Sequence, residues 1–202
     1  FCMCPGGFIV PAATANGEVV VNGMSPSKRN NLYANSGIVV EINSEKDLRK
    51  YEQFGPLKGL EYQKDLEKLA FTAGGKTQTA PAQRLTDFVE GKLSNSLNPC
   101  SYQPGLKSAP LHSLLPKLIG SRLRKGFDAF GKKMKGYYTS EANIVGVESR
   151  TSSPVCIPRT DTLEHPQVSG LYPCGEGGGY AGGIVSAAMD GERCAEAAAV
   201  GL

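Results

Sequence analysis

A glycine-rich segment near the end of the chain, residues 170–191, constrains the local fold more than any other feature. Six glycines lie from Gly175 to Gly183, and the apolar run Ile-Val-Ser-Ala-Ala-Met follows at once. This order predicts a strand before Gly175, a tight turn, and a helix of small residues that opens near Ile184. Small residues let a backbone approach a bulky planar ligand, and the first turn of a helix attracts anionic oxygens. A turn that merely packs a helix closely on a strand produces the same pattern.

The usual dinucleotide fingerprint does not occur upstream of Gly170. The pairs Gly6-Gly7 and Gly74-Gly75 lack the G-x-G-x-x-G spacing that joins a strand to a helix. The chain has no initiator Met and begins within an apolar run. We therefore expect a fragment of a longer protein, with an amino-terminal nucleotide-binding part as its partner.

The composition favours a cytoplasmic protein without a metal centre. No apolar run approaches the roughly 18 residues of a membrane span, and a net charge of +3 demands no polyanionic partner. The six cysteines, at 2, 4, 100, 156, 174 and 194, lack the paired spacing of zinc ligands. Free thiols in a reducing compartment explain them best. The close pair Cys2 and Cys4 leaves a redox or metal role open as a third-ranked alternative.

Apolar spacing predicts a mixture of short strands and helices. The expected strands are 8–10 and 18–21, joined by a turn at Asn16-Gly17 and ended by 22–26, and then 37–42, 144–148 and 155–157. The expected helices are 60–73, 82–90 and a broken segment from Leu111 to Phe130, with breaks at Gly120, Gly126 and Gly131. Residues 44–54 and 98–110 are expected to be loops.

The helices expected at 117–135 have a basic face opposite their apolar one. Such a stretch could bind RNA or a membrane surface, which gives a non-catalytic alternative for the function. A solvated face over a buried core explains the same pattern better, because no aromatic residues alternate with the charges. We therefore expect neither nucleic acid nor membrane as a partner.

Motifs along the whole chain resemble a family of bacterial FAD-dependent dehydrogenases, specifically their C-terminal region. The resemblance is carried by segments 1–7, 22–25, 34–39, 80–83, 87–88, 146–154 and 172–183. The chain departs from the family at Ser149, where Thr is usual, and at Gly178, where Ala is usual. We expect the turn to tolerate glycine in place of alanine at 178.

The resemblance implies an α/β fold, mixed α+β in this fragment, built from parts of two domains. Residues 1–165 would be mostly an inserted substrate domain. Residues 166–202 would supply the closing strand and last helix of a Rossmann-like FAD-binding domain. Because the rest of that domain would be absent, the isolated fragment is expected to be inactive.

The resemblance also implies FAD as cofactor and a small-molecule substrate. The expected cofactor contacts are Gly175, Glu176, Gly177, Ala181, Gly182, Gly183 and Ile184, with Glu176 accepting hydrogen bonds from cofactor hydroxyls. Substrate contacts are expected from Asn22, Met24, Arg150 and Ser152. Arg150 suits a substrate carboxylate, and Cys4 is either a thiol acid or a packed side chain. Only Cys4 and Arg150 are candidate catalytic residues.

Overall fold

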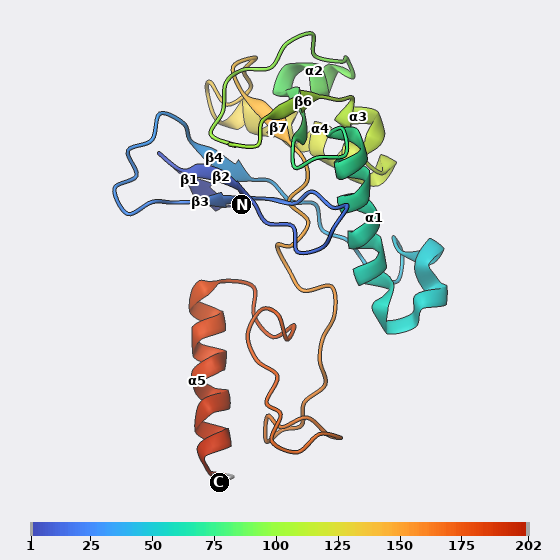
Figure 1. Cartoon of the computed structure of the whole chain (residues 1–202), viewed down its shortest axis with the longest axis vertical. Coiled ribbons are helices and arrows are strands. Elements are labelled where there is room, and N and C mark those ends of the chain that lie inside the picture. Colours follow the sequence, from blue (N-terminus) through green and yellow to red (C-terminus); the bar gives the residue numbers. More distant parts are fainter. Residues whose placement is uncertain (1, 201–202) are drawn as a thin grey trace. The chain divides into compact units, whose positions relative to one another are not determined.

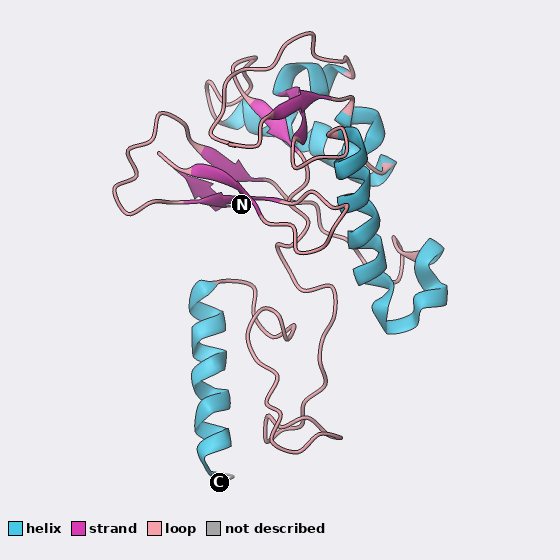
Figure 2. Ribbon diagram, viewed as in Figure 1, coloured by secondary structure: helices cyan, strands magenta, loops and turns pink. Residues whose placement is uncertain are grey.

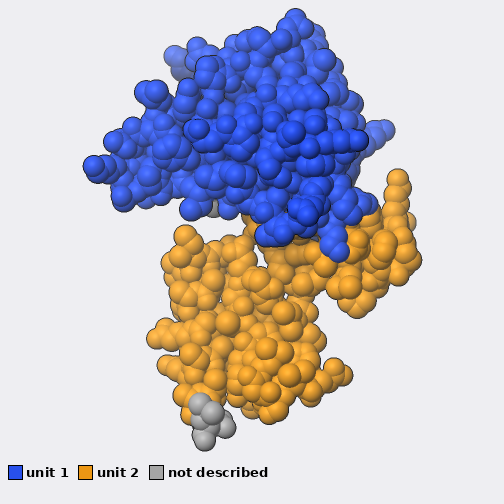
Figure 3. All heavy atoms as spheres, in the orientation of Figure 1, with its two compact units in different colours: residues 1–42, 64–149 blue, residues 43–63, 150–202 orange. Residues whose placement is uncertain are grey.

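The computed structural model describes residues 2–200, and the chain divides into two compact units (Figure 3). Unit 1 comprises Phe1–Ile42 and Lys64–Ser149, and unit 2 comprises Asn43–Gln63 and Arg150–Leu202. Helix α1 (Lys58–Ala73) begins in unit 2 and continues in unit 1. The expected boundary near residue 165 concerns the domains of a longer protein and stays a prediction.

Two antiparallel strand pairs begin unit 1 (Figure 1). Strand β1 (Cys2–Cys4) pairs with β4 (Asn35–Gly37), and β2 (Phe8–Pro11) pairs with β3 (Val21–Met24). The expected hairpin therefore forms, but its second strand was wrongly placed at 18–21 and ended too early.

Residues 18–20 are buried rather than paired as a strand, because they enter the core. The N–H of Val19 donates to the carbonyl of Glu67 in α1. The strand expected at 37–42 was also wrong, since only Gly37 belongs to β4. β-branched residues favour a strand, but a strand also needs a partner with free backbone groups.

A three-stranded sheet of order β6-β5-β7 follows. Its central strand β5 (Ala80–Arg84) runs parallel to β6 (Leu106–Ser108) and antiparallel to β7 (Asn143–Val145). Helix α2 (Leu85–Glu90) starts directly after β5. The helix expected at 82–90 was therefore wrong for 82–84, because those residues pair with β7. The loop expected at 98–110 contains β6, and the strand expected at 144–148 ends at Val145.

The long periodic segment forms α3 (Leu111–Leu114) and α4 (Lys117–Lys133). The break falls at Pro116, which has no N–H to donate, and not at the three glycines as expected. Gly120, Gly126 and Gly131 all lie inside α4. A Cβ at Gly131 would lie 2.6 Å from the Cβ of Tyr138, so this glycine permits close packing.

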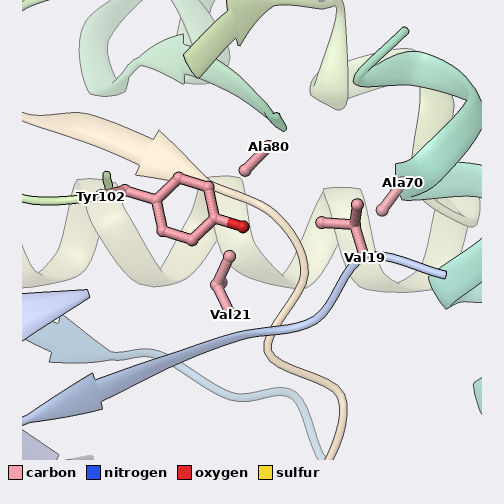
Figure 4. Packing of buried hydrophobic residues seen from close by; sticks show 5 residues of the cluster. All are labelled: Val19, Val21, Ala70, Ala80 and Tyr102. Atoms are coloured by element: carbon pink, nitrogen blue, oxygen red, sulfur yellow. The ribbon is translucent and has the colours of Figure 1, made fainter. Parts of the chain in front are cut away.

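Two hydrophobic clusters form the core of unit 1. The first cluster contains Val19, Val21, Ala70, Ala80 and Tyr102, whose side chains face one another in Figure 4. The second cluster contains Leu85, Phe88, Leu111 and Phe127. Helix α1 contributes Ala70 to the first cluster, and its bounds confirm the helix expected at 60–73. The N–H of Gly74, directly after the helix, donates to the carbonyl of Ala70.

Unit 2 consists of helices and long loops in its described residues (Figure 2). A 3₁₀ helix, η1 (Arg49–Leu57), overlaps the loop expected at 44–54, which was therefore wrong from Arg49 onward. Helix α5 (Ile184–Val200) is the last element. The strands expected at 155–157 and before Gly175 were wrong. Single backbone hydrogen bonds outside any sheet form there instead. The Ile157 N–H donates to the Gly178 carbonyl, and the His165 N–H donates to the Leu171 carbonyl.

Candidate functional site

The glycine-rich turn of unit 2, residues 175–183, links an extended segment to α5. Gly175 and Gly179 have φ of +68° and +86°, a left-handed conformation that glycine adopts without strain. Tyr180 N–H donates to the Gly175 carbonyl at 3.0 Å, and Gly179 N–H donates to Glu176 at 3.0 Å. The turn is thus closed by its own backbone.

Two glycines are required by neighbouring backbone. A Cβ at Gly178 would lie 2.9 Å from the Cys174 carbonyl oxygen, and one at Gly179 would lie 2.6 Å from the Val155 oxygen. Alanine at position 178 would therefore require the backbone to shift, because a backbone atom cannot move away as a flexible side chain can.

Gly177 and Gly182 have no such reason to be glycine. Neither has a positive φ. In the part of the chain that the structure describes, no atom beyond their chain neighbours lies within 4 Å of a Cβ built at either position. Neither backbone conformation nor packing among the described residues therefore requires glycine at these two positions, although glycine costs conformational entropy relative to alanine.

Helix α5 begins where expected, and its first carbonyl acceptor is Gly183, which receives the Ala187 N–H at 2.9 Å. The N–H groups of Gly182, Gly183 and Ile184 have no acceptor among residues 2–200. Unbonded N–H groups at the positive end of a helix dipole suit an electron-rich edge of a ligand.

Glu176 and Ala181 complete the expected cofactor contacts. Both are half-buried. Within the described residues the Glu176 carboxylate has neither a hydrogen bond nor an ion pair, so its oxygens are available as acceptors. The Ser153 hydroxyl contacts the Gly177 carbonyl at 3.2 Å and supports the turn from the preceding loop.

An ion pair between Arg159 and Asp190 lies against the turn. Their side chains are 10% and 8% exposed, and two bonds of 2.8 and 2.9 Å join the guanidinium to the two carboxylate oxygens. Hydrogen bonding to Arg159, followed by the bond from the Gly175 N–H, lowers the pKa of Asp190 from 3.8 to about 2. The guanidinium also lies 3.6 Å from the ring centroid of Tyr180.

Arg159, Asp190 and Tyr180 were not among the site residues predicted from the sequence. One signal for Asp190 was available in the sequence. Asp190 follows Ala187 by three residues and precedes Cys194 by four, so it is a carboxylate on the same, inner face of α5 as these two residues. A charge on the inner face of a helix requires a cation nearby. The sequence does not indicate which arginine supplies it.

Three of the expected substrate and catalytic residues lie close together in unit 1. Asn22 and Met24 belong to β3, and Cys4 ends the adjacent β1. The Cys4 sulfur lies 3.6 Å from a Cβ built at Gly23, between the other two. Because side chains alternate between the two faces of a strand, Cys4 lies on the face of β3 toward which position 23 points, and Asn22 and Met24 lie on the other face. Asn22 and Met24 are exposed and Cys4 is half-buried. Phe1 and the Cys2 side chain lie outside the described residues.

Arg150 and Ser152 belong to unit 2. Ser152 is exposed, whereas Arg150 is half-buried and already interacts with other residues of the chain. The roles predicted for these residues stay predictions.

Three basic side chains of α4 bond to other groups of unit 1. Arg122 donates to the Glu41 carbonyl, Arg124 donates to the Val89 carbonyl, and Lys132 pairs with Asp128 at 2.6 Å. The apolar face of α4 packs in the second core cluster through Phe127. This arrangement matches a solvated helix face, and no observation favours RNA or a membrane as its partner.

Within residues 2–200, no helix combines the length and hydropathy that crossing a bilayer requires. The same residues contain no group of three or more His, Cys, Asp or Glu side chains placed to hold a metal ion.

A family model and a relative from Clostridium beijerinckii match this chain. A family model described as FAD-dependent protein, C-terminal domain-like, matches residues 1–151. An uncharacterized protein of Clostridium beijerinckii is 43% identical over 198 residues, which are 97% of this chain. The chain spans only 36% of the length of that relative. The family match ends close to the division of the compact units after Ser149, while the similarity to the relative extends over nearly the whole chain. The chain therefore belongs to the FAD-dependent protein, C-terminal domain-like family.

Proposed function

We propose that the chain is the C-terminal part of an FAD-dependent dehydrogenase and that the turn at 175–183 contacts the flavin. Membership of an FAD-dependent family supports the cofactor. Bound FAD would supply hydride transfer, while the protein binds the flavin, orients it and tunes its electronics.

One observation carries the assignment of the turn. Gly177 and Gly182 leave open the space that a Cβ would fill, and the N–H groups of residues 182–184 have no acceptor within residues 2–200. A flat ligand that approaches this backbone explains both the missing side chains and the free donors. The residues present therefore fit a flavin, with Glu176 as an acceptor for cofactor hydroxyls.

In this proposal, residues 1–165 provide the substrate domain and 166–202 complete the FAD domain. Asn22, Met24, Arg150 and Ser152 stay the proposed contacts to a small-molecule substrate, and Cys4 and Arg150 stay the candidate catalytic residues. Five cysteines in the described residues are free thiols, which supports a cytoplasmic location.

The proposed partner is an amino-terminal part of the same protein. The chain spans about a third of the C. beijerinckii relative, which leaves room for the missing nucleotide-binding half. The outer face of α5 also lacks a cover: Ile184 and Val185 are 92% and 72% exposed. Apolar side chains so exposed at a helix start suit packing against further protein.

A matched pair of substitutions tests the flavin contact in the full-length protein. Gly182→Ala and Gly126→Ala each add one methyl where the described chain leaves space, and neither glycine has a positive φ. We expect Gly182→Ala to weaken FAD binding while Gly126→Ala, within α4, leaves it unchanged. Equal FAD affinity for both variants and the wild type would remove the support for this assignment.

A further inference from the structure

The ion pair of Arg159 and Asp190 also forms hydrogen bonds to backbone groups. The Asp190 carboxylate accepts the Gly175 N–H at 2.9 Å, and the Arg159 guanidinium donates to the Pro173 carbonyl at 3.0 Å. The residues on both sides of Cys174 are thereby fixed to the inner face of α5. The entry into the glycine-rich turn is thus anchored at two backbone groups.

A later residue of the turn, Tyr180, contacts the same guanidinium. Tyr180 stacks on Arg159 at 3.6 Å, and its hydroxyl donates to the Ile157 carbonyl at 2.7 Å. Its N–H bonds to Gly175. Gly175 and Tyr180 are therefore both placed by contacts that lead to one arginine, and the turn between them has little freedom.

Stability alone explains such a buried ion pair poorly. Removing two charges from water costs free energy that their attraction often fails to recover, and apolar replacements are frequently at least as stable. A bidentate arginine does, however, fix orientation strongly. The pair is placed where orientation matters, directly between the turn and the helix that follows it.

We propose that Arg159 and Asp190 are positioning residues that set how the backbone N–H groups of residues 182–184 face the flavin. The inference rests on the proposed function and adds a role for two residues that are not among the expected cofactor contacts. N–H groups at a helix start favour the reduced, more negative flavin. Loosening the pair should therefore weaken binding of reduced FAD more than that of oxidised FAD.

The test uses the full-length protein with Asp190→Asn and Arg159→Lys. Asp190→Asn keeps the shape but removes the charge, and Arg159→Lys keeps the charge but removes the fork. Glu192→Gln and Arg193→Lys are matched controls, since both residues are exposed on the same helix. The measurements are the FAD dissociation constant, the flavin midpoint potential, and hydrogen exchange of the Gly175 amide without cofactor.

We expect each Arg159 or Asp190 variant to bind FAD roughly tenfold more weakly, as loss of supporting residues does around other bound groups. A tenfold greater loss for reduced than oxidised FAD lowers a two-electron potential by about 30 mV. The Gly175 amide should exchange faster in both variants. The controls should match the wild type in all three measurements.

An unchanged potential and FAD affinity in a folded variant would overturn the positioning role, even if its melting temperature fell. If Asp190→Asn does not fold, Arg159→Lys decides the question by the same measurements. A wild-type protein that binds no FAD would instead contradict the proposed function, so the two failures are distinguishable. Faster exchange at Gly175 without any change at the flavin would make the pair purely structural.

Discussion

The Asp190 carboxylate accepts the N–H of Gly175 at 2.9 Å, so a helix residue fixes the first glycine of a turn fifteen positions earlier in the chain. The same carboxylate pairs with Arg159. The pH dependence of stability, the reactivity of Cys194 and the effect of Gly178→Ala follow from this contact and from the packing around it.

The stability of unit 2 should depend on pH through Asp190. Its folded-state pKa is lowered from 3.8 to about 2, so the pair stabilises the fold fully above the unfolded pKa. That contribution is lost as the pH falls toward the folded pKa. We expect the difference in urea midpoint between wild type and Asp190→Asn to be constant at neutral pH and to shrink below about pH 4.

The matched control for this pH dependence is Glu196→Gln, which neutralises an exposed carboxylate on α5. It should show little difference from the wild type at any pH. A difference for Asp190→Asn that stays constant down to pH 2 would mean that the ion pair does not stabilise the fold.

The thiols of unit 2 should react at different rates. Cys194 is 3% exposed, and burial, as the largest cause, raises its pKa. Cys156 and Cys174 are exposed. Since the thiolate is the reactive form, iodoacetamide should modify Cys156 and Cys174 first and Cys194 only on unfolding. Mass spectrometry of timed samples measures the order, and early labelling of Cys194 would contradict the buried position.

Gly178→Ala should destabilise the glycine-rich turn, although related proteins are expected to have alanine there. The new Cβ would lie 2.9 Å from the Cys174 carbonyl oxygen, which must then move. Overpacking of this kind typically costs about 1–3 kcal/mol. Urea unfolding of Gly178→Ala beside Gly182→Ala tests the contact, because Gly182 has free space; equal stability of the two variants would refute it.

Phe88→Ala should destabilise unit 1 by about 3–5 kcal/mol, the usual cost of removing a buried phenylalanine. Phe88 is 0% exposed and packs edge-on against Phe127 with ring centroids 6.1 Å apart. Leu93→Ala is the control, since Leu93 is 56% exposed and its loss should change stability little. Denaturant unfolding followed by circular dichroism gives both values.

Long periodic segments could be predicted from the sequence, and short strands could not. The helices at 58–73 and 184–200 follow from apolar spacing and from the glycines around them, and both formed nearly as expected. The strand at 80–84 was missed because Ala80 to Gln83 lie in a central, fully buried position. Pairing on both sides outweighed the local helical pattern there.

The candidate site could be predicted only in the part that is continuous in sequence. The turn at 175–183 was found because its glycines are close together in the sequence. Its anchor, in contrast, joins Arg159 to Asp190 across 31 positions. The breaks expected at glycines in 111–130 failed for a related reason. Gly131 lies inside α4, where the absence of a side chain makes room for Tyr138, and the proline that does break the segment was overlooked.

The most direct measurement is the visible absorption spectrum of the full-length protein, purified without added cofactor. We expect the absorption bands of an oxidised flavin, which dithionite bleaches, and their loss or weakening in Gly182→Ala but not in Gly126→Ala. A colourless wild-type protein that also takes up no added FAD would contradict the proposal that this turn contacts a flavin.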